Sequence, residues 1–258
     1  MHLTKPIIAA LLSGVSNGQF IAPDWRSSEQ SEHAQWEVFT QANFTHNTPD
    51  ISPDNATIVC TTSSAFLTSS GNIYSFQAPT YFQLDDSSPF PIENIVLQIS
   101  ALGSGIDLSG ARLIYENSEG TTVSIPAFRH FILSQEELGG ERGGLGTTYV
   151  LQWKPGNLPA GNTYSILFNA TESSLSLDKV SLDTSSSFIP ITKPKPLDIV
   201  RQGNQIIITW FGNWNLQTSK SLASGWTTIA TSESGNSITL PMTSSSKFFR
   251  LVQPVASE

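Results

Sequence analysis

Short runs of apolar and β-branched residues, separated by Gly, Asn, Pro and Ser, recur along the whole chain. In the longest run, Ile95 and Leu97 share one face and Gln98 lies on the other, which predicts a half-buried strand. Residues 163–170 repeat this alternation after a turn that contains Pro and Gly. About ten such runs precede residue 190, and they are 36–40, 57–61, 72–76, 80–84, 92–102, 111–115, 121–125, 147–153, 163–170 and 174–182.

The pattern departs from simple strands at three places. In the last run before residue 190, the apolar positions change face near Asp178, which predicts a β-bulge. The best helix candidate is Ser134–Leu138, because its first residue fits an N-cap and Glu137 completes a capping box; we expect one turn there at most. The Gly-rich residues 139–146 lack the Gly-Lys-Ser/Thr ending of a phosphate loop, and we interpret them as a flexible loop.

Three closely spaced prolines mark a domain boundary, because residues 189–196 cannot form a central strand with this spacing. We therefore expect a body over residues 19–190, a Pro-rich linker over 191–196 and a small β module over 197–258. Short apolar runs predict the strands of that module, and they are 205–210, 214–218, 225–230, 237–240 and 247–252.

Residues 1–18 have the features of an export signal. A basic residue, Lys5, precedes a short apolar run, and small residues lead to a cleavage position after Gly18. The run is shorter than the roughly 20 apolar residues needed to cross a bilayer, and no later run is long enough. We therefore expect a secreted or cell-surface protein with no membrane span in the mature chain.

The composition fits an extracellular β protein better than a cytosolic enzyme. The chain contains 37 Ser and 24 Thr, and charged residues make up 13% of it, about half the usual share. Residues 1–196 carry 18 acidic and 9 basic side chains, whereas residues 197–258 carry 3 and 4. Contacts to phosphate need clustered Lys or Arg, so this distribution argues against nucleic acid or anionic lipid as a partner.

Two parts of the chain resemble known families. Ile206–Trp210 and Lys247–Leu251 resemble the terminal fibronectin-III-like module of secreted bacterial proteins. Residues 19–190, with an early Trp-rich segment around Trp36 and a closing run around Asp178, are similar to the galactose-binding-like jelly rolls of surface proteins. The resemblance implies an all-β protein, in which a jelly-roll-type β-sandwich precedes a small fibronectin-III/immunoglobulin-like β-sandwich. It also implies a non-catalytic extracellular protein associated with carbohydrate.

Trp25, Arg129 and His130 are the candidate ligand-binding residues. Sugar recognition needs aromatic faces for CH groups and planar polar side chains for hydroxyls. Trp25 lies in a polar segment, and Arg129 and His130 lie between two phenylalanines. The alternative is structural: Trp25 covers an end of the sandwich, and Arg129 pairs with an acid. Neutral carbohydrate and another surface protein are the partners that fit.

The sequence predicts neither a metal nor a cofactor. Calcium takes six to eight oxygen ligands, and Asp85, Asp86 and Asp178 form no spaced ladder of acids. The histidines are scattered without the spacing of zinc ligands. The single cysteine, Cys60, lies in a β-like run, which predicts a buried and unreactive thiol.

Catalytic motifs are lacking as well, so we expect no enzyme. The chain contains neither a Gly-x-Ser-x-Gly elbow nor a His-Glu-x-x-His motif, and Glu136-Glu137 is the one tight acidic pair of the loop region. The leading hypothesis is an exported, non-catalytic β-sandwich protein that acts as a binding or structural component of a surface or extracellular matrix. The alternatives are a lectin-like module for neutral glycans and a divergent polysaccharide-active enzyme.

Overall fold

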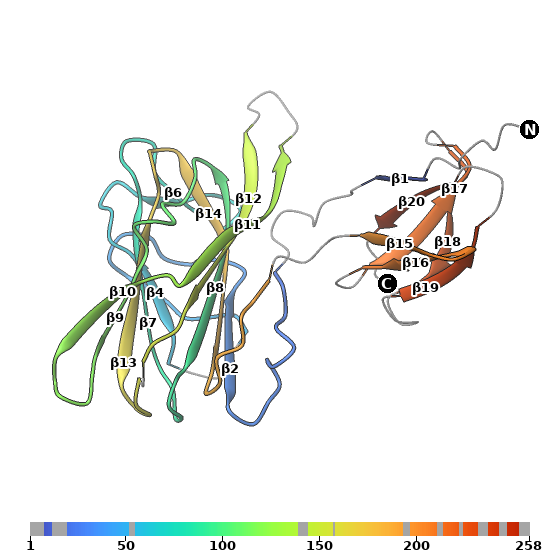
Figure 1. Ribbon diagram of the computed structural model, residues 1–258. Helices are drawn as coiled ribbons and strands as arrows, with labels where there is room; N and C mark the ends of the chain where they lie inside the picture. Colours follow the sequence, from blue (N-terminus) through green and yellow to red (C-terminus); the bar gives the residue numbers. More distant parts are fainter. Residues whose placement is uncertain are drawn as a thin grey trace, which may run out of the picture. The chain divides into compact units, whose positions relative to one another are not determined.

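The chain folds as two compact units built from β-strands (Figure 1). One unit is Ser16–Thr192, and the other is Lys193–Glu258 together with Met1–Val15. Every regular element in the described part of the chain is a strand, which confirms the all-β prediction, and no helix there could cross a membrane. The computed structural model describes residues 8–11, 20–51, 55–138, 144–156, 158–192, 197–210, 214–221, 224–231, 237–242 and 247–252.

Two antiparallel sheets form the larger unit. The six-stranded sheet contains, in order, β10 (Thr122–Pro126), β9 (Arg112–Glu116), β13 (Thr163–Asn169), β7 (Tyr81–Ser87), β4 (Thr57–Cys60) and β3 (His46–Asn47). The seven-stranded sheet contains, in order, β11 (Arg129–Glu137), β12 (Leu145–Trp153), β8 (Asn94–Gly103), β14 (Leu175–Ser185), β6 (Ile73–Tyr74) and β5 (Phe66–Leu67), with β2 (Ser31–Trp36) also paired to β14.

One apolar core lies between these two sheets, as in a β-sandwich. Alternate side chains of each strand point inward, because the strand repeat is two residues. Trp36 and Trp153 from the seven-stranded sheet and Tyr164 from the six-stranded sheet are all buried there. Phe82 and Phe168 stack with their ring centroids 5.0 Å apart. The core therefore joins strands from the whole length of the unit.

β8 is buried on both faces, so the prediction of a half-buried strand is wrong. Ile95 and Leu97 face the core, and Gln98, on the opposite face, is also fully buried. The cause is a cover that two segments, 20–30 and 186–192, form over the outer face of the seven-stranded sheet. The apolar contacts of this cover join Ile21, Trp25 and Ile191 to Val96, Leu133 and Val150.

The predicted helical turn at Ser134–Leu138 is also wrong, because its first four residues belong to β11. β11 pairs with β12 along its whole length, with a register shift between Ile132 and Ser134. A single helical turn is unstable by itself, whereas this ladder satisfies the backbone groups of a nine-residue strand. Pairing across the sheet therefore outweighs the local capping signal.

The bulge predicted near Asp178 is confirmed. The register of β14 against β8 shifts between Leu177 and Lys179, so Asp178 is the extra residue. Its carboxylate accepts a hydrogen bond of 2.9 Å from the Ser100 hydroxyl. The bulge lets apolar residues face the core on both sides of the shift.

The smaller unit contains two further sheets. One consists of β15 (Asp198–Gln202), β16 (Gln205–Thr209) and β19 (Ser237–Pro241), and the other of β1 (Ile8–Leu11), β20 (Lys247–Val252), β17 (Asn215–Ser219) and β18 (Thr227–Ala230), each in this order. β1 lies within the predicted export signal and runs parallel to β20. A small core fills the unit, and its buried residues are Ile206, Ile208, Trp210, Trp214, Leu216, Phe249 and Leu251.

Candidate functional site

Trp25 lies in the cover of the seven-stranded sheet, with its side chain packed inward. It is 9% exposed and packs in one cluster with Ile21, Val96 and Ile191. Stacking against a sugar needs an open ring face. The structure instead uses this ring to bury the outer face of the sheet.

Arg129 and His130 begin β11, and their side chains point to opposite faces of the sheet. The Arg129 guanidinium donates a hydrogen bond of 2.8 Å to the carbonyl of Ile191, so its partner is a backbone group and not an acid. His130 is exposed. The three predicted residues therefore do not face one common surface, although Trp25 and Arg129 both contact Ile191.

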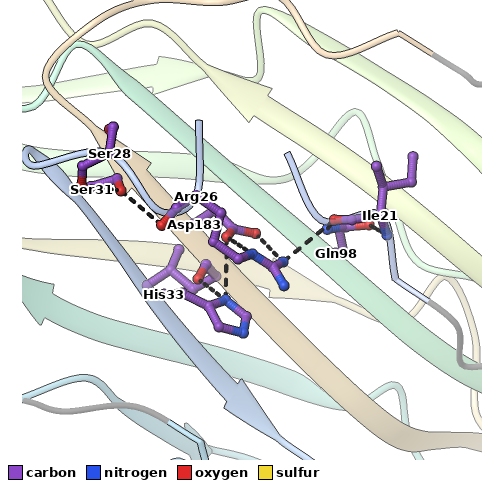
Figure 2. A network of polar contacts seen from close by, with 8 residues as sticks. Ile21, Arg26, Ser28, Ser31, His33, Gln98 and Asp183 are labelled. Carbon is purple, nitrogen blue, oxygen red and sulfur yellow. Dashed lines mark hydrogen bonds and ion pairs between the residues drawn. The ribbon is translucent and has the colours of Figure 1, made fainter. Parts of the chain in front are cut away.

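A buried ion pair follows Trp25 in the cover (Figure 2). Arg26 Nε donates to Asp183 Oδ1 at 2.6 Å, and Arg26 Nη2 donates to Asp183 Oδ2 at 2.9 Å. The Asp183 side chain is fully enclosed, whereas the Arg26 side chain is 21% exposed. His33 Nδ1 lies 3.2 Å from Asp183 Oδ1. This bidentate pair fastens the cover to β14.

Two buried glutamines, Gln98 and Gln152, bind the backbone of the first and last described segments of the larger unit. We call these two side chains the amide pins. Gln98 accepts a hydrogen bond of 2.8 Å from the N–H of Ile21 and donates one of 2.7 Å to its carbonyl. Gln152 accepts from the N–H of Ile191 at 2.9 Å and donates to the carbonyl of Ile189 at 2.8 Å. Each amide satisfies backbone groups that a neighbouring strand would otherwise satisfy.

Three aromatic rings lie at the edge of the seven-stranded sheet that β6 and β5 form. We call these three residues, Phe66, Tyr74 and Phe76, the aromatic edge. Phe66 and Phe76 stack with centroids 5.6 Å apart, and Tyr74 meets Phe76 edge to face at 4.5 Å. Phe66 is 40% exposed and Phe76 is 66% exposed. Leu67 and Ile73 alternate with these rings and pack on the core, so the rings face outward.

The aromatic edge lies beside a turn that is rich in hydroxyls and contains no charged residue. The turn between β5 and β6 contains Thr68, Ser69 and Ser70, and the next strand, β14, presents Ser176 opposite Tyr74. Exposed aromatic rings beside hydroxyls and amides are a combination that suits sugars, because CH groups meet the rings and hydroxyls meet the polar groups. This cluster is the candidate binding site of the larger unit.

Two acids, Glu32 and Asp86, line a small cavity between the sheets at one end of the sandwich. The cavity has a volume of about 10 Å³, which fits one water molecule. Tyr164 donates a hydrogen bond of 2.6 Å to Asp86 from its buried hydroxyl. An open groove of about 380 Å³ lies beside the cavity, and Glu32 is the one acid among the described residues that line it. The paired acids thus share a space too small for a sugar ring.

Tyr164 gives this end of the sandwich a pH dependence. Burial, followed by the charge of Asp86 and its hydrogen bond, raises the pKa of Tyr164 well above its ordinary value. Tyrosine in an unfolded chain titrates near pH 10. The stabilisation from this group is therefore complete below about pH 10 and is lost as the pH rises toward the folded pKa.

We expect Tyr164→Phe to remove this alkaline dependence, because phenylalanine has no proton to lose. The free energy of unfolding of the wild type should fall faster between about pH 10 and 11 than that of the variant. Urea unfolding followed by circular dichroism measures both slopes. Tyr81→Phe, which changes a side chain that is 53% exposed, should keep the wild-type slope. Equal slopes for Tyr164→Phe and the wild type would contradict the prediction.

The remaining sequence predictions concern isolated side chains. Cys60 is buried as predicted, and burial raises the pKa of its thiol. Asp85 accepts hydrogen bonds from Gln83 and Ser165. Among the residues that the structure describes, no group of three His, Cys, Asp or Glu side chains could hold a metal ion. The side chain of Glu136 and residues 139–143 lie outside the described part of the chain.

Comparisons with known proteins identify no family for this fold and site. No protein-family model matches the chain, and no curated protein matches it significantly. The structure is that of an all-β protein of two units, and the larger unit has two antiparallel sheets around one core.

Proposed function

We propose that this protein is an exported, non-catalytic β-sandwich protein that serves as a binding component of a cell surface or extracellular matrix. The observation that carries the proposal is the aromatic edge, where two phenylalanines are 40% and 66% exposed beside a turn rich in hydroxyls. Water-exposed aromatic clusters are costly for a soluble domain, and they mark interaction sites. The jelly-roll and fibronectin-III-like resemblances of the two parts agree with an extracellular role.

The buried polar groups of the larger unit support a scaffold rather than a reaction centre. The amide pins and the Arg26–Asp183 pair hold backbone segments in place, and the paired acids Glu32 and Asp86 line a cavity of about 10 Å³. A polysaccharide-active enzyme needs its two carboxylates on either side of a bound sugar. The arrangement therefore favours binding over hydrolysis.

The hydroxyl-rich turn beside the aromatic edge, which contains no charged residue, favours a neutral polysaccharide as the ligand. Charged ligands need charged partners, whereas sugar rings are held by CH contacts with aromatic faces and by hydroxyl groups. The turn beside the rings offers Thr68, Ser69 and Ser70. A lectin-like module is thus the form of the proposal that this surface supports.

A pull-down assay with insoluble cellulose and chitin tests this ligand class. We expect the wild type to bind at least one of them and the Phe66→Ala/Phe76→Ala double variant to bind about 30-fold more weakly, since each ring contributes about 1 kcal/mol. Phe128→Ala is the matched control, because Phe128 is 59% exposed and lies next to β11, at the other edge of the sheet. It should bind like the wild type.

Three results would contradict the proposal. Equal losses in the control and the double variant would remove the aromatic edge as the site, and no binding to either polysaccharide would direct the search to protein partners. New reducing ends after incubation with soluble oligosaccharides would show an enzyme. Near-ultraviolet circular dichroism of each variant checks that the fold is retained.

A further inference from the structure

A groove of about 540 Å³ opens on the smaller unit, at one end of its sheet β20-β17-β18. Two lysines, Lys220 and Lys247, line it together with Gly225, and we call it the cationic groove. Its other lining side chains are hydroxyls, and they are Thr218, Ser219, Ser221, Ser224 and Thr227. Its volume lies within the range of pockets for small ligands or for one or two sugar units.

The two lysines come together because of the strand register. Ser219, the last residue of β17, pairs with Phe248 of β20, so Lys220 and Lys247 are the next residues outward on the two neighbouring strands. Like charges in this position repel and destabilise a sheet. Within the described part of the chain, neither ammonium group has a carboxylate partner. An anion between them would remove the repulsion.

Hydrogen bonds join the described residues on the two sides of the loop at the groove. The Ser219 hydroxyl donates to the carbonyl of Ser224 at 2.7 Å and accepts from the N–H of Ser221 at 3.0 Å. Gly225 has a φ of 76°, a conformation that a side chain would strain. One hydroxyl thus links Ser219 to Ser224, and the glycine lets the chain turn toward β18.

The basic side chains of this unit are concentrated on one sheet. Residues 197–258 contain 4 basic and 3 acidic residues. Lys220, Lys247 and Arg250 all lie on or beside β17 and β20, whereas Asp198 lies on β15 in the other sheet. Arg250 stacks over Trp226 at 4.3 Å and donates to Gln217, so it is already engaged. The two lysines are therefore the cations beside β17 and β20 that remain available.

We propose that the cationic groove binds an anionic polysaccharide. The two ammonium groups would hold one sulfate or carboxylate group, and the hydroxyls around them would meet neighbouring sugar hydroxyls. An acidic peptide fits less well, because the described residues of the lining offer hydroxyls and ammonium groups rather than apolar side chains for a peptide to bury. Residues 1–196 carry an excess of acidic side chains, 18 against 9, so the attraction comes from local contacts and not from the field of the whole chain.

The test is a calorimetric titration of the full chain with dextran sulfate at low salt, with dextran and polyglutamate as comparison ligands. We expect dextran sulfate to bind and dextran not to bind at this groove. The Lys220→Gln/Lys247→Gln double variant should lose at least about tenfold in affinity, because two charge-assisted contacts are removed. Both side chains lie at the surface, so the variant should keep its fold.

Arg201→Gln is the matched control, because Arg201 is an exposed cation of the same unit on β15. It should change the affinity less than about twofold. An equal loss in this control, no binding of dextran sulfate, or equally tight binding of polyglutamate would each overturn the proposal. The Phe66→Ala/Phe76→Ala variant should still bind dextran sulfate, so failure of the aromatic edge and failure of the cationic groove are separate results.

Discussion

Replacing Arg26 by methionine should destabilise the larger unit by about 3–5 kcal/mol, because it leaves a buried carboxylate without its main partner. Asp183 is fully enclosed and accepts two hydrogen bonds from the Arg26 guanidinium. Of the ionisable side chains that contact Asp183 in the described structure, only His33 would remain. Urea unfolding followed by near-ultraviolet circular dichroism measures the change, and hydrogen exchange of the β14 amides assigns it to this unit.

A second variant, in which Asp183 is also replaced, separates the effect of the unpaired charge from the effect of lost packing. In the Arg26→Met/Asp183→Asn variant no charge is buried at this position, so we expect it to be more stable than Arg26→Met alone by at least about 1 kcal/mol. Lys179→Met is the control, since Lys179 and Glu37 form an ion pair whose side chains are 32% and 37% exposed. Its loss should cost about 0–1 kcal/mol. Equal costs for Arg26→Met and Lys179→Met would contradict the account of a buried pair.

Trp36→Ala should lower the free energy of unfolding by about 3–5 kcal/mol, as much as Arg26→Met, but for a different reason. The side chain is fully buried in the core, so truncation leaves a large cavity, and its Nε1 donates a hydrogen bond of 3.0 Å to the Asn47 carbonyl. Asn47 in turn bonds to the backbone of Thr40 and Gln41, which shapes the loop after β2. Thermal unfolding of the variant should show the loss directly.

A comparison with Trp153 tests how much the hydrogen bond of Trp36 contributes to stability. It is as buried as Trp36, but its Nε1 has no hydrogen-bond partner among the residues that the structure describes. Trp153→Phe removes an unsatisfied donor, whereas Trp36→Phe removes a satisfied one. We therefore expect Trp153→Phe to be the milder change by about 1 kcal/mol. The opposite order in unfolding experiments would mean that shape, not hydrogen bonding, decides the cost at these two sites.

The sequence predicted strands well where one apolar face alternates over several residues. Residues 163–170 show this in the sequence, and β13 spans Thr163–Asn169. The parity change near Asp178 likewise predicted the bulge in β14. β11 was missed because its polar end matched a capping box, and two-residue strands such as β5 leave no periodic signal at all.

A single sequence does not predict which distant residues come together in the candidate sites. Arg26 and Asp183 are 157 residues apart in the chain, and only the fold brings them together. A weak signal did exist, since Asp183 directly follows the predicted run 174–182, and an acid that is buried at the end of a strand needs a partner. The aromatic edge had a comparable signal, because Tyr74 and Phe76 lie two residues apart in a predicted strand.

The amide pins also determine how the larger unit would respond to mechanical load. Its first and last described segments are held on one sheet face, and the adjoining strands, β2 and β14, meet at their ends through Ser31 and Ser185. Force applied to the two ends would peel these antiparallel strands apart one pair at a time instead of shearing them. Before any pair opened, the load would fall on Gln98, Gln152 and the Arg26–Asp183 bond. The unit would therefore yield first at a few side-chain contacts, with its core still closed.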